Sequence, residues 1–261
     1  MDEGKAEIIR RFVDNVKGQV YDPTGYNVRH DGAEGHWLES KMGLAANALN
    51  EADLFGYEMK KPTRSKTTFG DWSPDICLWG RKKPYDDIEK LDRDSEFLKY
   101  FGKPNLLKNG RLSWSGEPVP TIRGYNSFGQ ILQIDQDKNI LASYSYDKDH
   151  RQNKDIIIPQ AFQRNDLIIA KWSKDILKNK VESKFNDKGW FTFIKNSLGQ
   201  YVSIGFGDPI DYSDWIELVK KGTVFFDSGM YAGNKRPYSQ WRASNNYWYD
   251  LIDEQYTEYP E

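Results

Sequence analysis

The ten residues 51–60, EADLFGYEMK, constrain the fold more than any other part of the sequence. Residues 53–59 are expected to form a β-strand with a bend at Gly56. Because side chains on a strand alternate between its two faces, Glu58 and Lys60 are expected on one face. Tyr57 and Met59 are then expected on the other face, packed into the protein.

Asp53 lies just before these residues, and Gly56 predicts a bend that returns the Asp53 carboxylate to the side of Glu58. Two carboxylates and the ammonium group of Lys60 would then converge. Phosphodiester hydrolysis with Mg²⁺ uses these three groups, because carboxylate oxygens bind the cation and a lysine can orient the water that the cation binds. An Asp-x₄-Glu-x-Lys pattern also occurs by chance on solvated strands, so the segment alone leaves both interpretations open.

A second segment, residues 31–43 with the sequence DGAEGHWLESKMG, precedes the first. Its glycines open a helix that we expect from about residue 35 to residue 42, ending at Gly43. Glu39 lies near the middle of this helix among apolar neighbours. A buried charge is costly without a partner, and a metal cluster or the lysine of the next strand would provide one. The alternative is a glutamate on the helix surface.

The two segments in this order resemble the MutH-like type II restriction endonucleases, the MvaI and BcnI group of the PD-(D/E)xK superfamily. The pattern of that group is a Gly-x-x-Gly-x-x-Leu-Glu helix followed by Asp-x₄-to-₆-Glu-x-Lys on a hairpin. In this chain it reads Gly32-x-x-Gly35-x-x-Leu38-Glu39, then Asp53, Glu58 and Lys60. The resemblance is specific over residues 29–70.

The resemblance implies Asp53 and Glu58 as metal ligands, Lys60 as the water-positioning residue and Glu39 as a supporting carboxylate. It implies a Mg²⁺-dependent enzyme that cuts double-stranded DNA at a short sequence of the CC-N-GG kind, leaves 5′-phosphates and acts as a monomer. The expected fold is α+β, a restriction-endonuclease-like core with a mixed sheet flanked by helices, together with a DNA-recognition lobe that forms a cleft.

Several residues outside the motif have side chains suited to DNA. Arginine donates paired hydrogen bonds to guanine, asparagine pairs with adenine, and lysine and serine contact phosphates. One stretch, residues 233–242, is expected to be a loop that can enter a DNA groove, because it contains Gly and Pro. The alternative is a loop with a purely structural role, in which Trp241 packs and the arginines pair with Asp227 or Asp250. The DNA-binding candidates are Lys66, Arg111, Asn234, Arg236, Ser239 and Arg242.

The remaining pattern predicts alternating strands and helices, with residues 1–110 as the catalytic lobe. Residues 111–261 are expected to form mainly the recognition lobe, with some elements returning to the catalytic core. Strand 75–80 is expected antiparallel to strand 53–59. Further predicted elements are an opening helix at 6–17, hairpins 130–134/139–146 and 190–195/200–206, strand 166–172 leading into helix 174–185, and helix 213–220 before strand 223–227.

The composition fits these expectations without proving them. The single cysteine, Cys77, excludes an internal disulfide and a cysteine-rich zinc site. No apolar run is long enough for a membrane helix and the first residues lack a secretory signal, so we expect a bacterial cytoplasmic protein with no membrane contact. The net charge of −2 counts mildly against a nucleic-acid partner. Two alternatives therefore stay open, a strand-nicking mismatch-repair endonuclease and a non-catalytic DNA-binding module.

Overall fold

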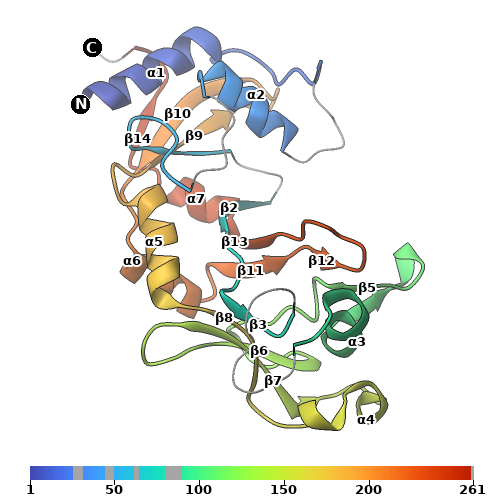
Figure 1. The fold of residues 1–261 in the computed structure, drawn as a ribbon. Helices are drawn as coiled ribbons and strands as arrows, with labels where there is room; N and C mark the ends of the chain where they lie inside the picture. Colours follow the sequence, from blue (N-terminus) through green and yellow to red (C-terminus); the bar gives the residue numbers. More distant parts are fainter. Residues whose placement is uncertain (26–31, 45–49, 62–64, 80–89, 260–261) are drawn as a thin grey trace. The chain divides into compact units, whose positions relative to one another are not determined.

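The computed structural model describes residues 1–25, 32–44, 50–61, 65–79 and 90–259. The chain forms two compact units (Figure 1). Unit 1 contains Met1–Thr67, Lys180–Asp211 and Ser244–Glu261, and unit 2 contains Thr68–Asn179 and Tyr212–Ala243. The first division therefore falls at residue 67 and not near residue 110, and two later segments return to the unit that holds the Asp-Glu-Lys motif.

Unit 1 is built on a mixed four-stranded sheet in the order β1-β9-β10-β14. Strand β1 runs parallel to β9, and the pairs β9/β10 and β10/β14 are antiparallel. This is the mixed sheet flanked by helices that the sequence predicts. Its elements are α1 (Glu3–Asn15), α2 (Ala33–Lys41), β1 (Glu58–Lys60), β9 (Trp190–Lys195), β10 (Tyr201–Gly207), α7 (Asn245–Asp250) and β14 (Glu254–Tyr256).

The helices of unit 1 cover both faces of this sheet. The apolar side chains of α1 and α2, among them Phe12 and Leu38, form one buried cluster with Phe191 of β9. Trp190 is next to Phe191 in the strand and so points to the opposite face, where its ring meets Trp248 of α7 at 5.0 Å between centroids. Strand β1 is thus held at the edge of a sheet that is packed on both sides.

Unit 2 contains mainly antiparallel strands. Its largest sheet has the order β3-β8-β7-β6, and a smaller one has the order β12-β5-β4. The elements are β3 (Ile76–Cys77), η1 (Arg93–Phe97), α3 (Leu98–Phe101), β4 (Lys103–Asn105), η2 (Leu106–Lys108), β5 (Arg111–Trp114), β6 (Phe128–Ile134), β7 (Ile140–Asp149), α4 (Lys154–Ile157), η3 (Gln160–Phe162), β8 (Leu167–Trp172), α6 (Tyr212–Lys220), β11 (Phe225–Ser228) and β12 (Met230–Tyr231). Three further elements, β2 (Lys66–Asp71), α5 (Lys174–Phe185) and β13 (Ser239–Ser244), have residues in both units.

Most predicted elements are present, but one predicted pairing is wrong. Both predicted hairpins form, and strand β8 leads directly into α5. Strand β3, within the predicted strand 75–80, pairs with β8 and not with the motif strand, which takes β9 as its partner. Pairing of this kind depends on contacts between distant segments that local alternation does not specify. Residue 80 lies outside the described residues.

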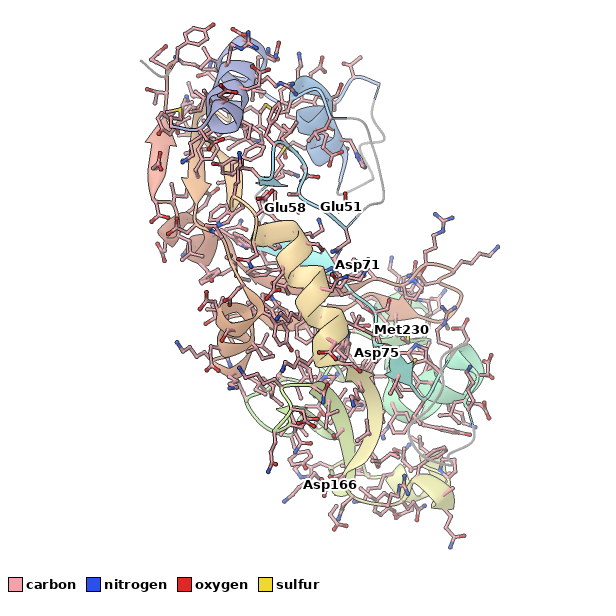
Figure 2. All side chains as sticks on the ribbon, turned by 60° about the vertical axis from the view of Figure 1, so that its left-hand side comes forward. Glu51, Glu58, Asp71, Asp75, Asp166 and Met230 are labelled. Atoms are coloured by element: carbon pink, nitrogen blue, oxygen red, sulfur yellow. The ribbon has the colours of Figure 1, made fainter. Side chains whose placement is uncertain are left out.

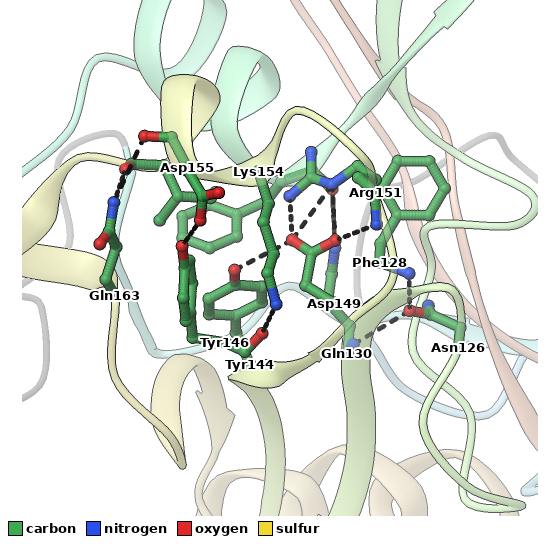
Figure 3. A network of polar contacts seen from close by, with 12 residues as sticks. Asn126, Phe128, Gln130, Tyr144, Tyr146, Asp149, Arg151, Lys154, Asp155 and Gln163 are labelled. Atoms are coloured by element: carbon green, nitrogen blue, oxygen red, sulfur yellow. Dashed lines mark hydrogen bonds and ion pairs between the residues drawn. The ribbon is translucent and has the colours of Figure 1, made fainter.

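A buried ion pair closes the end of β7 in unit 2 (Figure 3). The guanidinium of Arg151 donates to both carboxylate oxygens of Asp149, and the hydroxyl of Tyr144 donates to the same carboxylate at 2.9 Å. Arg151 also lies over the ring of Phe128, at 5.0 Å from its centroid. A buried carboxylate is tolerated here because each of its oxygens has a charged or hydroxyl donor.

Among the described residues no helix is long and apolar enough to span a membrane.

Candidate active site

A tight turn precedes β1 and shapes the candidate site. Leu54 and Tyr57 exchange both backbone hydrogen bonds across it, at 3.0 and 2.8 Å. The two central residues, Phe55 and Gly56, both have positive φ, at 51° and 87°. Positive φ at both central positions is the geometry of a type I′ turn, which reverses the chain within two residues. The predicted bend at Gly56 is confirmed.

The turn returns the carboxylate of Asp53 to β1. Its Oδ2 accepts a hydrogen bond from the backbone N–H of Met59 at 2.9 Å. Burial, and next the negative charge of Glu58, raise the pKa of Asp53 to about 6. The charge of Glu58 thus acts on the Asp53 carboxyl, and the convergence of the two carboxylates on one cation stays a prediction.

Glu58 and Lys60 lie on the same side of β1, as the alternation predicts. The Lys60 Nζ donates to Glu58 Oε1 at 2.8 Å, and both side chains are buried. Tyr57 and Met59 are buried in the apolar cluster of unit 1, on the other face. The second oxygen of the carboxylate, Glu58 Oε2, is also buried and has no hydrogen-bond partner among the described residues. A buried carboxylate oxygen without a donor is a group that still needs a cation or a donor.

A second lysine, which the sequence analysis does not anticipate, reaches the same carboxylate. The Nζ of Lys184, near the C-terminal end of α5, donates to Glu58 Oε1 at 2.8 Å. Figure 2 shows Glu58 beside this end of the helix. Burial alone would raise the pKa of Glu58, but the charges of Lys60 and Lys184 lower it, so the carboxylate is ionised. Lys184 lies outside the motif, and no spacing in the sequence indicates it.

This arrangement fits a divalent cation with few protein ligands. Asp53 contributes one carboxylate, and Glu58 contributes a buried oxygen that no donor satisfies. In the described part of the chain, no three His, Cys, Asp or Glu residues form a metal cage. Mg²⁺ is bound in many enzymes by one or two carboxylates together with waters and substrate phosphates, so two carboxylates suffice for it.

Comparison with known proteins identifies the family of this chain. Residues 16–256 match the family described as LlaMI restriction endonuclease. The chain belongs to the LlaMI restriction endonuclease family. Its relatives include the type II restriction enzyme ScrFI of Lactococcus lactis subsp. cremoris, which is 48% identical over 97% of this chain and 98% of that enzyme. As a member of the family, the protein is a site-specific deoxyribonuclease.

A solved structure gives the fold independently. The restriction endonuclease MvaI, in complex with its cognate DNA substrate, superposes with a TM-score of 0.58 at 15% sequence identity, covering 98% of each chain. This likeness confirms the restriction-endonuclease-like α+β fold. It also agrees with the MutH-like resemblance that rests on the two sequence segments.

Glu39 is the fourth candidate catalytic residue. Its partner is not one of the two that the sequence analysis proposed for a buried carboxylate. Its Oε2 lies 3.0 Å from Nδ1 of His36 on the same helix, and the side chain is 35% exposed. The partner is therefore a helix neighbour, and neither a metal cluster nor the lysine of β1. Glu34, five residues earlier, is the carboxylate of α2 that faces the sheet, where it pairs with Lys61 at 3.0 Å.

Five of the six DNA-binding candidates lie on adjacent elements of unit 2. Strand β12 pairs with β5, and the guanidinium of Arg111 on β5 stacks over the ring of Tyr231 on β12 at 3.7 Å. The segment between β12 and β13 contains Asn234 and the exposed Arg236. Ser239 and Arg242 are on β13, so the predicted loop 233–242 ends in a strand. Lys66, the sixth, begins β2, and residues 62–64 before it lie outside the described residues.

The contacts of Arg242 are those of the alternative interpretation, in which the arginines of this stretch pair with acidic residues of the protein itself. The Arg242 Nε lies 3.3 Å from Oδ2 of Asp227 and also donates to Gln240 at 2.7 Å. Trp241 is completely buried. In the same segment, the side-chain amide of Asn234 donates to the backbone oxygen of Gly229 at 3.0 Å. These side chains thus have structural partners within unit 2, whereas Arg236 extends toward solvent.

Proposed function

We propose that Asp53, Glu58 and Lys60 form the catalytic centre of this restriction endonuclease, and that the enzyme hydrolyses phosphodiester bonds of double-stranded DNA with Mg²⁺. The observation that supports this most strongly is the buried, unsatisfied Oε2 of Glu58, next to a carboxylate returned by a tight turn and an ammonium group on the same strand. Structural ion pairs rarely leave a charged oxygen buried without a donor.

Each residue of the chain has a distinct part in this reaction. Asp53 and Glu58 would hold the cation through one oxygen each. When bound, Mg²⁺ lowers the pKa of a coordinated water and offsets the charge that develops on the phosphate. Lys60 is fixed by Glu58 Oε1 and lies over the ring of Phe185, with Nζ at 4.8 Å from the ring centroid. An ammonium group held in this way can orient the attacking water and favour its deprotonation.

We further propose a short target of the CC-N-GG kind, products with 5′-phosphates and action as a monomer in the bacterial cytoplasm. These details follow the resemblance to the MvaI and BcnI group. The stretch from Tyr231 to Arg242, with Arg111 beside it, is the proposed DNA-reading surface, because its exposed arginine can donate two hydrogen bonds to guanine. Arg236 is its strongest base-contacting candidate.

The test is cleavage of plasmid DNA by the purified protein with Mg²⁺, followed by sequencing of the fragment ends. Double-strand cuts at one short sequence with 5′-phosphates are expected. Nicks in one strand only, or cutting that needs further proteins, would support the mismatch-repair alternative. Specific binding without any cut would support the non-catalytic module.

A further inference from the structure

The two oxygens of the Glu58 carboxylate differ in their hydrogen bonds to lysine ammonium groups. Lys60 and Lys184 both donate to Oε1 at 2.8 Å, whereas Oε2 has no partner in the part of the chain that the structure describes. One lysine would be enough to compensate the charge of one carboxylate. The second lysine therefore needs an explanation beyond pairing.

Lys184 is held at this place by the fold. The side-chain amide of Asn50 donates to the backbone oxygen of Lys180 and to Oγ of Ser183, both at 2.9 Å. The Ser183 hydroxyl donates to the backbone oxygen of Asn50 at 2.8 Å. The backbone N–H of Ala52 donates to the backbone oxygen of Ser183 at 3.1 Å. The last turn of α5 is thus fixed to the segment that leads into Asp53, which places the backbone of Lys184 within reach of Glu58.

A divalent cation that approaches Glu58 must therefore approach two positive charges. In a partly buried site such charges are poorly screened, and each one weakens the binding of a further cation. Lys60 has a part in the proposed reaction, but Lys184 has none there. A DNA phosphate in the site would offset the extra positive charge, and the cation would then bind more tightly.

We propose that Lys184 is a positioning residue that holds Glu58 in the cation-free enzyme and makes divalent-cation binding depend on DNA. It occupies Oε1 from the helix side, leaves Oε2 for the cation, and keeps cation affinity low until a phosphate arrives. This proposal rests on the proposed function in one respect, the assignment of Glu58 as a cation ligand.

The test is Mn²⁺ binding by the DNA-free protein, measured by electron paramagnetic resonance at pH 8 and fixed ionic strength. Lys184→Met removes the charge and keeps the length of the side chain, so Mn²⁺ affinity should rise about tenfold. Lys184→Gln should act in the same direction, and Lys184→Arg should bind Mn²⁺ like the natural protein. Adding duplex DNA should raise Mn²⁺ affinity less in Lys184→Met than in the natural protein.

A matched control is Lys5→Met. The Lys5 side chain is 15% exposed and pairs with Glu254 at 2.8 Å. The Lys184 side chain is 17% exposed and pairs with Glu58 at the same distance. Lys5→Met should leave Mn²⁺ affinity unchanged even if it lowers stability as much as Lys184→Met does. Unchanged or weaker Mn²⁺ binding in both neutral variants of Lys184 would overturn the proposal. If Glu58→Gln keeps full Mn²⁺ affinity, the assignment of Glu58 as a ligand fails instead.

Discussion

The carboxylate of Asp53 accepts a hydrogen bond from the backbone N–H of Met59, the residue between Glu58 and Lys60 in β1. This one contact, at 2.9 Å, fixes an acidic side chain from before the turn against the strand that follows it. The motif residues of the candidate site, Asp53 to Lys60, are therefore a local structure of eight residues that its own turn stabilises. Burial and the charge of Glu58 make ionisation of Asp53 unfavourable, and the first two predictions follow from this.

Asp53→Asn should stabilise the protein at pH 8 while abolishing cleavage. The folded-state pKa of Asp53, about 6, lies above the ordinary value of 3.8, so the folded protein binds this proton more tightly than the unfolded chain does. Ionised Asp53 therefore costs stability above about pH 6, and removing its charge should yield about 1–3 kcal/mol. Urea unfolding should show this gain at pH 8 and its decrease as the pH falls toward 4. A variant that is less stable at pH 8 would contradict the origin of the shift.

Cation binding should weaken in acid because of the same group. A protonated Asp53 cannot ligate a cation, so Mn²⁺ affinity of the DNA-free protein should fall as the pH is lowered through about 6, by up to about tenfold per pH unit. Calorimetric titration at pH 5, 6, 7 and 8 measures this. The Asp53→Asn protein serves as the control, with weaker binding that changes little over the range. Constant affinity in the natural protein between pH 5 and 7 would exclude Asp53 as a ligand.

Lys60→Met should reduce the rate of DNA cleavage by about 100-fold or more and leave specific DNA binding intact, because the proposed role of the ammonium group is to orient the attacking water. The rate is measured with plasmid DNA in single-turnover conditions, and binding by fluorescence anisotropy in the absence of Mg²⁺. Lys61→Met is a suitable control, since Lys61 is the next residue but pairs with Glu34 on α2. Cleavage at the natural rate by Lys60→Met would remove Lys60 from the reaction.

Gly56→Ala should damage both stability and activity. Residue 56 has φ of 87°, which costs about 1 kcal/mol for a residue with a side chain, and an added Cβ would lie 2.3 Å from Oδ2 of Asp187. Distortion of this turn moves Asp53 away from β1. Gly199→Ala is the matched control, because its φ is 79° and an added Cβ meets only Val20, at 3.9 Å. Both variants should be less stable by thermal unfolding, but only Gly56→Ala should lose cleavage.

Arg242→Ala should weaken binding to the specific sequence by about 1–3 kcal/mol if Arg242 contacts a base. Its contact with Asp227 provides the comparison, because Asp227→Asn disturbs the same pair from the other side. An equal loss of stability in both variants, with unchanged discrimination between specific and nonspecific DNA, would assign Arg242 a structural role. Arg236→Ala, in the exposed segment, should then show the larger effect on specificity.

The sequence predicts the local part of the candidate site well. Alternation along β1 places Glu58 and Lys60 together, and Gly56 indicates the turn that returns Asp53, because both signals depend on residues close in the chain. The helix with Glu39 is also predicted, but the partner of Glu39 is not. A histidine three residues earlier satisfies that carboxylate, and helix spacing alone could have indicated this pair.

The long-range part of the site could not be predicted. The partner strand of β1 is β9, and Lys184 reaches Glu58 across 126 residues of sequence. Alternation identifies strands but does not say which strands pair, so strand 75–80 was an equally reasonable neighbour. The second lysine is one of several on a polar helix, and only its hydrogen bond to Glu58 distinguishes it.

The pairing of β1 with β9 has a consequence for the synthesis of a nuclease inside a living cell. Thr192 on β9 donates its hydroxyl hydrogen to the backbone oxygen of Lys60, 132 residues earlier in the chain. A ribosome-bound chain that has emerged only as far as unit 2 lacks this partner strand, and it also lacks Lys184. Strand β1 therefore has no partner strand until residues 190–195 have been synthesised, so we expect a shorter chain not to form the candidate site.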